Sequence, residues 1–258
     1  QSGAWMSAYR DQQRIDGEVL TLVSNNSNFI KGQPISWDDA RTMFHEFGHA
    51  LHGLNSNVTY PSLSGTNTTR DFVEFPSQLN EHWLSTPEVL KFLVNAQGEP
   101  IPKSLVERLE KARTFNEGFA TAEAQASAIV DMKLHLAGET PIDPKAFEQQ
   151  ILAEIGMPRQ LVMRHRIPAF AHIFSGDGYA AGYYSYIWAE VLERDAYEAF
   201  LEAGGPYDRS VANRLYEAVM SVGDTVDPAE AFRKFRGRDP KPDALLRAKG
   251  FALQETRS

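Results

Sequence analysis

The stretch SWDDARTMFHEFGHALHGL, residues 36–54, decides the fold of this chain. Ser36 followed three residues later by Asp39 has the spacing of a capped helix start, in which each side chain bonds the backbone of the other residue. The apolar residues that follow recur at helical spacing, namely Trp37, Ala40, Phe44, Phe47, Leu51 and Leu54. We therefore predict an amphipathic helix over this stretch.

His45, Glu46 and His49 form the pattern HExxH on that helix. Residues i and i+4 lie about 40° apart around a helix, so the two imidazoles can bind one metal ion. Glu46 is offset by about 100° from His45, where it can take a proton from a water without being a ligand. Gly48 between the histidines indicates that another element packs close. The alternative is a helix whose histidines serve packing or solvation.

A catalytic zinc usually has three protein ligands and one open position. Glu74, 25 residues after His49, is the candidate third ligand, and a surface carboxylate is the alternative. Pro76 permits either a helix that begins near Phe75 or a kinked helix that begins near Asp71. We treat His52 as an orienting or structural residue, because a fourth protein ligand would close the position that water needs.

Two polar residues follow Glu74 at helical spacing. Gln78 and Glu81 lie one and two turns beyond it and could orient the metal ligands through hydrogen bonds, a common need at zinc sites. Solvation is the alternative for Glu81.

A tyrosine-rich segment, GYAAGYYSYIW, covers residues 178–188. We predict a helix over 179–201, which would place Tyr179, Tyr183 and Tyr186 on one face. Glycines at 176, 178 and 182 would keep the approach to that face open. A tyrosine hydroxyl can donate a hydrogen bond to the oxyanion that forms when water attacks a peptide carbonyl. An aromatic packing stripe is the alternative.

Three segments in this order resemble the thimet oligopeptidase family of zinc metallopeptidases, the gluzincins. They are HEFGHALH at 45–52, SGTNTTRDFVEFPSQ at 64–78 and GYAAGYYSYIW at 178–188. Within that family the chain most resembles the bacterial peptidyl-dipeptidase (dipeptidyl carboxypeptidase) branch. The resemblance extends from about residue 3 to about residue 251, which is nearly the whole chain.

The resemblance implies roles for individual residues. The residues that match His45, His49 and Glu74 bind one zinc ion per chain, and the one that matches Glu46 is the general base and proton shuttle. Tyr186 and Tyr179 would stabilise the oxyanion or bind the substrate. The resemblance places His172 against the peptide nearby, with Tyr183 as a further substrate contact.

Release of dipeptides from a C-terminus requires a group that binds the terminal carboxylate. Guanidinium groups suit this task because they bind carboxylates bidentately. Our candidates are Arg164 and Arg166, with Arg70 behind them, and ion pairs within the chain are the alternative. His82, His135 and His165 do not have the spacing of metal ligands, and we expect no role for them at the metal site.

Composition limits the partners of the chain. The formal net charge of −8 argues against nucleic acid and against an anionic membrane, since both bind basic surfaces. No run of 18 apolar residues that could span a bilayer occurs in the sequence. The absence of cysteine excludes disulfides and cysteine-bound zinc. It suits a cytoplasmic localisation.

The expected fold is mainly α: a zincin-like helical catalytic domain over residues 1–258, with a small β element near the N-terminus that includes a strand at 19–23. Helix starts are predicted at Thr86-Pro87, Asp143-Pro144 and Asp227-Pro228, where an N-cap residue precedes proline at the first helical position. A long helix is predicted over 115–137.

Length separates this chain from the family it resembles. Family members are typically more than twice as long, and their helical N-terminal part forms one wall of a channel over the zinc. This chain corresponds to the catalytic C-terminal portion. We therefore expect a fragment of a longer protein, half of a split enzyme, or a natural short form that covers an exposed apolar face as a homodimer.

The expected function is zinc-dependent hydrolysis of peptide bonds in short peptides, with release of C-terminal dipeptides. One alternative is an endo-acting oligopeptidase that needs no free C-terminus. The other is a zinc-binding fragment that has no activity without the missing N-terminal half.

Overall fold

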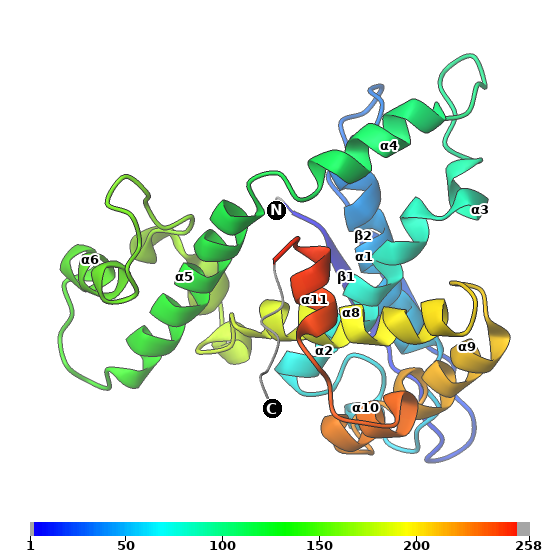
Figure 1. Ribbon diagram of the computed structural model, residues 1–258. Coiled ribbons are helices and arrows are strands. Elements are labelled where there is room, and N and C mark those ends of the chain that lie inside the picture. Colours follow the sequence, from blue (N-terminus) through cyan, green and yellow to red (C-terminus); the bar gives the residue numbers. More distant parts are fainter. Residues whose placement is uncertain (1–2, 252–258) are drawn as a thin grey trace, which may run out of the picture.

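Helices form most of the chain, as the sequence predicts. The computed structural model describes residues 3–251 (Figure 1). The longer helices are α1 (Trp37–Leu54), α2 (Arg70–Glu81), α4 (Lys103–Ala112), α5 (Glu117–Leu136), α6 (Pro144–Glu154), α8 (Ser185–Glu202) and α10 (Pro228–Arg236). The shorter ones are α3 (Pro87–Leu90), α7 (Ala171–Phe174), α9 (Arg209–Leu215) and α11 (Asp243–Ala248). None of these helices is both long enough and apolar enough to cross a membrane.

A small antiparallel sheet lies near the N-terminus, formed by β1 (Trp5–Arg10) and β2 (Leu22–Asn26). The second strand begins three residues later than the predicted strand at 19–23. The ladder shifts register between Ala8 and Arg10 and ends at Leu22. The side chain of Arg10 donates to the carbonyl of Leu20 at 2.8 Å, so this carbonyl bonds a side chain instead of a strand.

Helix α1 begins where the sequence predicts. The hydroxyl of Ser36 accepts from the backbone N–H of Asp39 at 3.0 Å, and the Asp39 carboxylate accepts from the N–H of Ser36 at 3.0 Å. The sheet packs against this helix, and the hydroxyl of Thr21 donates to the carbonyl of Gly53 at 2.9 Å. The cap and the sheet together fix both ends of the helix that carries HExxH.

Helices α1 and α2 approach each other closely at Gly48. A Cβ at this position would lie 2.6 Å from the Cα of Ser77, a distance that real side chains do not reach. The glycine therefore allows α2 to pack close to α1, as its position between the histidines indicated. Of the two arrangements that Pro76 left open, the structure has the longer helix, which begins at Arg70 and contains the proline.

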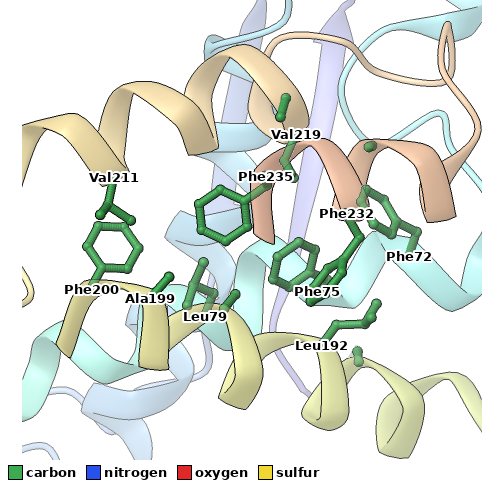
Figure 2. Close-up of a cluster of buried hydrophobic side chains, with 14 residues drawn as sticks. Phe72, Phe75, Leu79, Leu192, Ala199, Phe200, Val211, Val219, Phe232 and Phe235 are labelled. Carbon is green, nitrogen blue, oxygen red and sulfur yellow. The ribbon is translucent and has the colours of Figure 1, made fainter. Parts of the chain in front are cut away.

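The main hydrophobic core joins α2, α8, α10 and the segment 211–219 (Figure 2). Phe75 of α2 is fully buried, and its ring centroid lies 5.9 Å from that of Phe232 of α10. Phe200 of α8 is 1% exposed and lies beside Val211 in Figure 2. Burial of each large side chain of this kind stabilises the fold by roughly 1.5–3 kcal/mol.

A second hydrophobic core lies in what we call the α5–α6 lobe, residues 117–174. In Figure 1, α5 and α6 lie to one side of the other helices. The buried residues of this core are Ala126, Val130, Ile151, Leu152, Met163, Ile167, Phe170 and Ile173. The ammonium group of Lys249 lies 2.6 Å from the Glu117 carboxylate of the lobe and 3.2 Å from that of Glu190 on α8.

Three predicted helix starts are confirmed. The side chain of Asp143 accepts from the N–H of Ala146, and that of Asp227 accepts from the N–H of Ala229. Thr86 precedes only the short α3. The long helix predicted over 115–137 is α5, with its ends moved by one or two residues.

The prediction of a helix over 179–201 is wrong at its beginning. Helix α8 begins at Ser185, so Tyr179 and Tyr183 do not lie on it. Residues 177–179 form a single 3-10 turn, and Ala181 has a φ of 56°, which a right-handed helix excludes. The glycines at 178 and 182 disfavour a helix here, and Asp131 accepts from backbone N–H groups of this loop.

Candidate metal centre

His45, His49 and Glu74 come together as the sequence predicts. Their nearest ligand atoms all lie within 4.8 Å of one another. The Nε2 atoms of His45 and of His49 are each 3.2 Å from Oε2 of Glu74. Two turns of α1 and one turn of α2 therefore direct two imidazole nitrogens and one carboxylate oxygen at the same point, which we call the metal point.

Charges around this point favour a cation. Burial raises the pKa of Glu74, but hydrogen bonds with His45 and His49 outweigh it and hold the pKa well below its usual range. Burial lowers the pKa of His45, but the contacts with Glu74 and Glu81 outweigh it and raise the pKa to about 10. A divalent cation would supply the positive charge that these two carboxylates favour.

Glu81 contacts one of the candidate ligands, at a position from which the sequence analysis expected it to orient them. Its Oε1 lies 2.7 Å from Nδ1 of His45, and its Oε2 lies 3.1 Å from the Arg41 guanidinium. The Nδ1–H of His45 can thus donate to Glu81 while Nε2 faces the metal point, the usual arrangement of a histidine ligand. Gln78 does not contact the ligands, because its amide donates to the carbonyl of Tyr186 at 3.2 Å.

The donor set fits zinc. Two histidine nitrogens with one glutamate oxygen is the ligand set of zinc peptidases, and it leaves a fourth position for water or substrate. His52 is outside the cluster. Burial, with nearby His49, lowers the pKa of His52 to about 3, so this ring is neutral at pH 7. Within residues 3–251 neither of its ring nitrogens has a hydrogen-bond partner.

Glu46 lies next to the metal point and is 7% exposed. Burial raises the pKa of Glu46 above its ordinary value, against the opposing influence of His45 and His49. The backbone of Met6 on β1 also lies near this carboxylate. A carboxylate with a raised pKa is a better proton acceptor, which suits a general base.

Tyr179 and Tyr186 stack face to face beside the metal ligands, with ring centroids 5.6 Å apart. The hydroxyl of Tyr179 donates to Oε1 of Glu74 at 2.7 Å. The hydroxyl of Tyr186 lies 3.0 Å from Nε2 of His172. Burial and the charge of Glu74 raise the pKa of Tyr179 to about 12 and that of Tyr186 further, so both phenols stay protonated as donors.

Tyr183 belongs to an aromatic cluster between the lobe and the site. Its ring centroid lies 4.8 Å from that of Phe170 in the lobe core, 5.6 Å from His172 and 5.4 Å from Tyr186. Partial burial and Arg70 lower the pKa of His172. The Arg70 guanidinium itself lies 4.5 Å from the ring centroid of Tyr179.

The two arginine candidates have different environments. The Nε of Arg166 lies 2.5 Å from Glu148, a carboxylate that is 2% exposed, so this guanidinium compensates a buried charge. Arg164 is exposed and close enough to Tyr183 to influence its pKa, and no ion pair involves it in the described part of the chain. This difference favours Arg164 as the group available to a ligand.

The remaining histidines do not join the metal cluster. His82 pairs with Glu193 and stacks on Tyr197, and His165 stacks on Phe170 with centroids 4.7 Å apart. His135 contacts Asp131 at 2.9 Å. Asp131, which contacts the loop of residues 176–184 before α8, is a residue that the sequence analysis missed. Its spacing of four residues from His135 on a predicted helix was the available signal.

Comparison with known proteins shows the family of the chain. The family model described as peptidase family M3 matches residues 1–251. The dipeptidyl carboxypeptidase of Salmonella typhimurium is 42% identical over 258 residues, which is 96% of this chain and 38% of the relative. That of Escherichia coli is 40% identical, over 97% of this chain and 38% of the relative. Oligopeptidase A of Escherichia coli is 34% identical, over 95% of this chain and 37% of the relative. The chain thus spans somewhat over a third of the length of these relatives.

Proposed function

The chain belongs to peptidase family M3, and on that premise we propose that it is a zinc peptidase that releases dipeptides from the C-terminus of short peptides. The observation that carries this proposal is the convergence of His45, His49 and Glu74 on one point, with Glu46 and two protonated tyrosines around it. Residues 1–258 would act as one catalytic domain.

The metal would be held by Nε2 of each histidine and by the Glu74 carboxylate. When bound there, zinc supplies Lewis acidity, which lowers the pKa of a water and polarises the substrate carbonyl. All other parts of the reaction belong to side chains of the protein.

Glu46 would take one proton from the attacking water and deliver it to the leaving amine. Its buried position raises its pKa, so it can accept the proton and later release it. As the water oxygen bonds the carbonyl carbon, negative charge develops on the carbonyl oxygen. The hydroxyl of Tyr186 or Tyr179 would donate a hydrogen bond to this oxyanion, a contribution that such donors often make.

Dipeptide release is favoured by the names of two relatives and by Arg164. Both are dipeptidyl carboxypeptidases by name, although the chain covers only 38% of each. Arg164 offers an exposed guanidinium next to the aromatic cluster, where a terminal carboxylate could bind. The third relative is named oligopeptidase A, and we keep an endo-acting oligopeptidase as the second candidate.

The test is product analysis by mass spectrometry of a ten-residue peptide, with its C-terminus either free or amidated. Stepwise release of dipeptides from the free peptide alone is the expected result. Equal cleavage of both peptides would establish the endo-acting alternative. Glu46→Gln, loaded with zinc in parallel, is the control against a contaminating peptidase.

Failure to cleave either peptide would contradict activity of this chain on its own. The same samples would then be analysed by sedimentation, since a homodimer and a monomer predict different masses. The cytoplasmic localisation expected from composition stays a prediction.

A further inference from the structure

Asp131 of α5 is a buried carboxylate outside the metal cluster, and it accepts hydrogen bonds from a loop distant in sequence. Its side chain is 1% exposed. Oδ1 accepts from the backbone N–H of Ala181 at 3.0 Å, and Oδ2 accepts from that of Tyr183 at 2.9 Å. Oδ1 also lies 2.9 Å from Nδ1 of His135. Both carboxylate oxygens therefore bond the tyrosine loop, residues 176–184.

These contacts determine where the protons are. Nδ1 of His135 lies 3.0 Å from the carbonyl oxygen of Asp131, in addition to the 2.9 Å contact with Oδ1. The backbone nitrogen of Ala181 also lies 3.2 Å from this Nδ1, but its N–H donates over a shorter distance, 3.0 Å, to Oδ1 of Asp131. The two oxygens that face Nδ1 therefore favour a proton on it. His135 thus donates to Asp131, and Asp131 accepts from three donors. Each carboxylate oxygen accepts from a different backbone N–H, so an amide, which has an NH2 donor in place of one oxygen, could satisfy only one of the two groups in this geometry.

The tyrosine loop needs these acceptors because it is not a helix. Ala181 has a φ of 56°, and the loop contains Gly176, Gly178 and Gly182. A buried or partly buried N–H that lacks a partner costs roughly 1–3 kcal/mol. Asp131 accepts from two such groups and so selects one conformation among those that the glycines allow.

The two site tyrosines differ in how much they depend on this loop. Tyr186 lies on α8, and its carbonyl accepts from Gln78 of α2 at 3.2 Å, so the metal-bearing helices also hold it. Tyr179 lies two residues before Ala181 and outside any long helix. Its hydroxyl nevertheless donates to Glu74, the ligand from α2, at 2.7 Å. The position of Tyr179 therefore depends on the path that Asp131 imposes on the loop.

We infer that Asp131, oriented by His135, is a positioning residue that holds the tyrosine loop on the α5–α6 lobe and thereby sets Tyr179 against the metal centre. This inference rests on the proposed function only in its kinetic consequence. The lobe carries His172 as well, so one carboxylate links the half of the site that the lobe provides to the half on α1 and α2.

The test compares zinc-loaded wild type with Asp131→Asn, which keeps the size of the side chain and replaces one acceptor by a donor. Backbone amide exchange of residues 176–186 should rise at least tenfold in the variant. For the peptidase reaction, kcat should fall by about 10- to 100-fold with KM changed less than threefold, because misplaced catalytic groups weaken the transition state more than substrate binding.

Asp195→Asn is the matched control. Asp195 is also a fully buried carboxylate, but it contacts Arg236, Arg238 and the N–H of Lys241 instead of the loop. Its replacement should leave exchange of residues 176–186 and kcat within about twofold of wild type. If both variants changed exchange and kcat equally, general destabilisation would explain the effect and the inference would be wrong.

His135 provides a milder pair of variants in case Asp131→Asn does not fold. His135→Ala removes the donor to Asp131 and should lower kcat by about three- to tenfold. His135→Asn places an amide N–H near the position of Nδ1 and should restore most of this loss. Equal activity of the two variants would contradict the role of His135.

The outcomes separate the inference from the proposed function. A wild-type chain that cleaves no peptide contradicts the proposed function, while amide exchange of residues 176–186 still decides whether Asp131 fixes the loop. Unchanged exchange in Asp131→Asn overturns the inference. Increased exchange with unchanged kcat overturns it too, because the loop would then not position Tyr179.

Discussion

The candidate site has two halves that are built differently. The metal half consists of α1 and α2, whose ligands lie at fixed spacings on regular helices in close contact at Gly48. The tyrosine half consists of His172 and residues 176–186, most of which precede α8 and lie in an irregular loop that bonds Asp131. Regular helices thus carry the candidate metal ligands. The loop that bonds Asp131, together with the start of α8, carries the tyrosine hydroxyls that can donate hydrogen bonds.

The two constructions give the two halves different mobility. A ligand on a helix moves only when the helix moves, so the metal half is preorganised for one geometry. A loop with three glycines can adopt several paths, which would let the tyrosines adjust to a substrate. Four changes test this comparison, taken from the largest expected effect to the smallest.

Tyr186→Phe should lower kcat strongly while leaving zinc affinity unchanged, which is the largest difference that we expect between the two halves. Loss of one oxyanion donor typically lowers kcat by about 10²- to 10³-fold, and the phenyl ring keeps its packing against Tyr179. Zinc affinity should stay unchanged, because Tyr186 contacts no metal ligand atom directly in the described residues. Steady-state kinetics and a zinc competition titration measure these two quantities.

Tyr184→Phe is the control for this variant. The hydroxyl of Tyr184 donates to Asp71 at 3.1 Å in an exposed contact, and neither residue belongs to the candidate metal cluster. Its kcat should stay within about twofold of wild type. A Tyr186→Phe variant with the same kcat as Tyr184→Phe would remove Tyr186 from the mechanism.

Glu81→Gln should weaken the metal half alone. The carboxylate that accepts from Nδ1 of His45 orients this ring, and loss of such a partner typically lowers metal affinity by about 10- to 100-fold. Titration against a chelator of known affinity measures the change. At saturating zinc, kcat should recover toward the wild-type value. A variant that binds zinc normally would show that Glu81 does not orient His45.

Gly48→Ala should force α1 and α2 apart. The added Cβ would meet the Cα of Ser77 at 2.6 Å, and such overpacking typically lowers the free energy of unfolding by about 1–3 kcal/mol. Gly118→Ala on α5 is the matched control, since a Cβ there meets nothing within 4 Å. It should raise the free energy of unfolding by roughly 0.5–1 kcal/mol. Thermal unfolding that ranks the two variants the other way would contradict the close contact.

Arg164→Gln should change substrate preference and little else. Loss of a guanidinium contact to a terminal carboxylate should raise KM for the free peptide about tenfold and leave the amidated peptide unchanged. Arg166→Gln should instead lower the melting temperature, because Glu148 would remain buried without its partner. Equal KM changes for both peptides would exclude Arg164 as the carboxylate contact.

The sequence predicted the convergence of His45, His49 and Glu74, because most of the information for it is local. The cap at Ser36, the four-residue spacing of the histidines and the glycine at 48 each act within one or two helical turns. Glu74 needed the additional expectation that a second helix crosses the first. The long helix α5 and the proline starts at 144 and 228 were local signals as well.

The tyrosine half was predicted only in part because its information is long-range. Spacing alone placed Tyr179 and Tyr183 on a helix, whereas the loop follows the acceptors that Asp131 offers from 50 or more residues away in the chain. The role of Arg166 in compensating buried Glu148 likewise depends on α6. No pattern within the segment 176–186 contains the contacts with Asp131, and no pattern next to Arg166 contains the contact with Glu148.

The zinc content of purified chains, measured after saturation and removal of excess metal, decides whether this site holds a metal. We expect one zinc per chain in wild type and in Glu46→Gln, a loss of binding in Glu74→Gln, and peptide cleavage in wild type alone. Equal zinc content in Glu74→Gln and wild type, or loss of zinc in Glu46→Gln, would contradict the assignment of Glu74 as ligand and Glu46 as base.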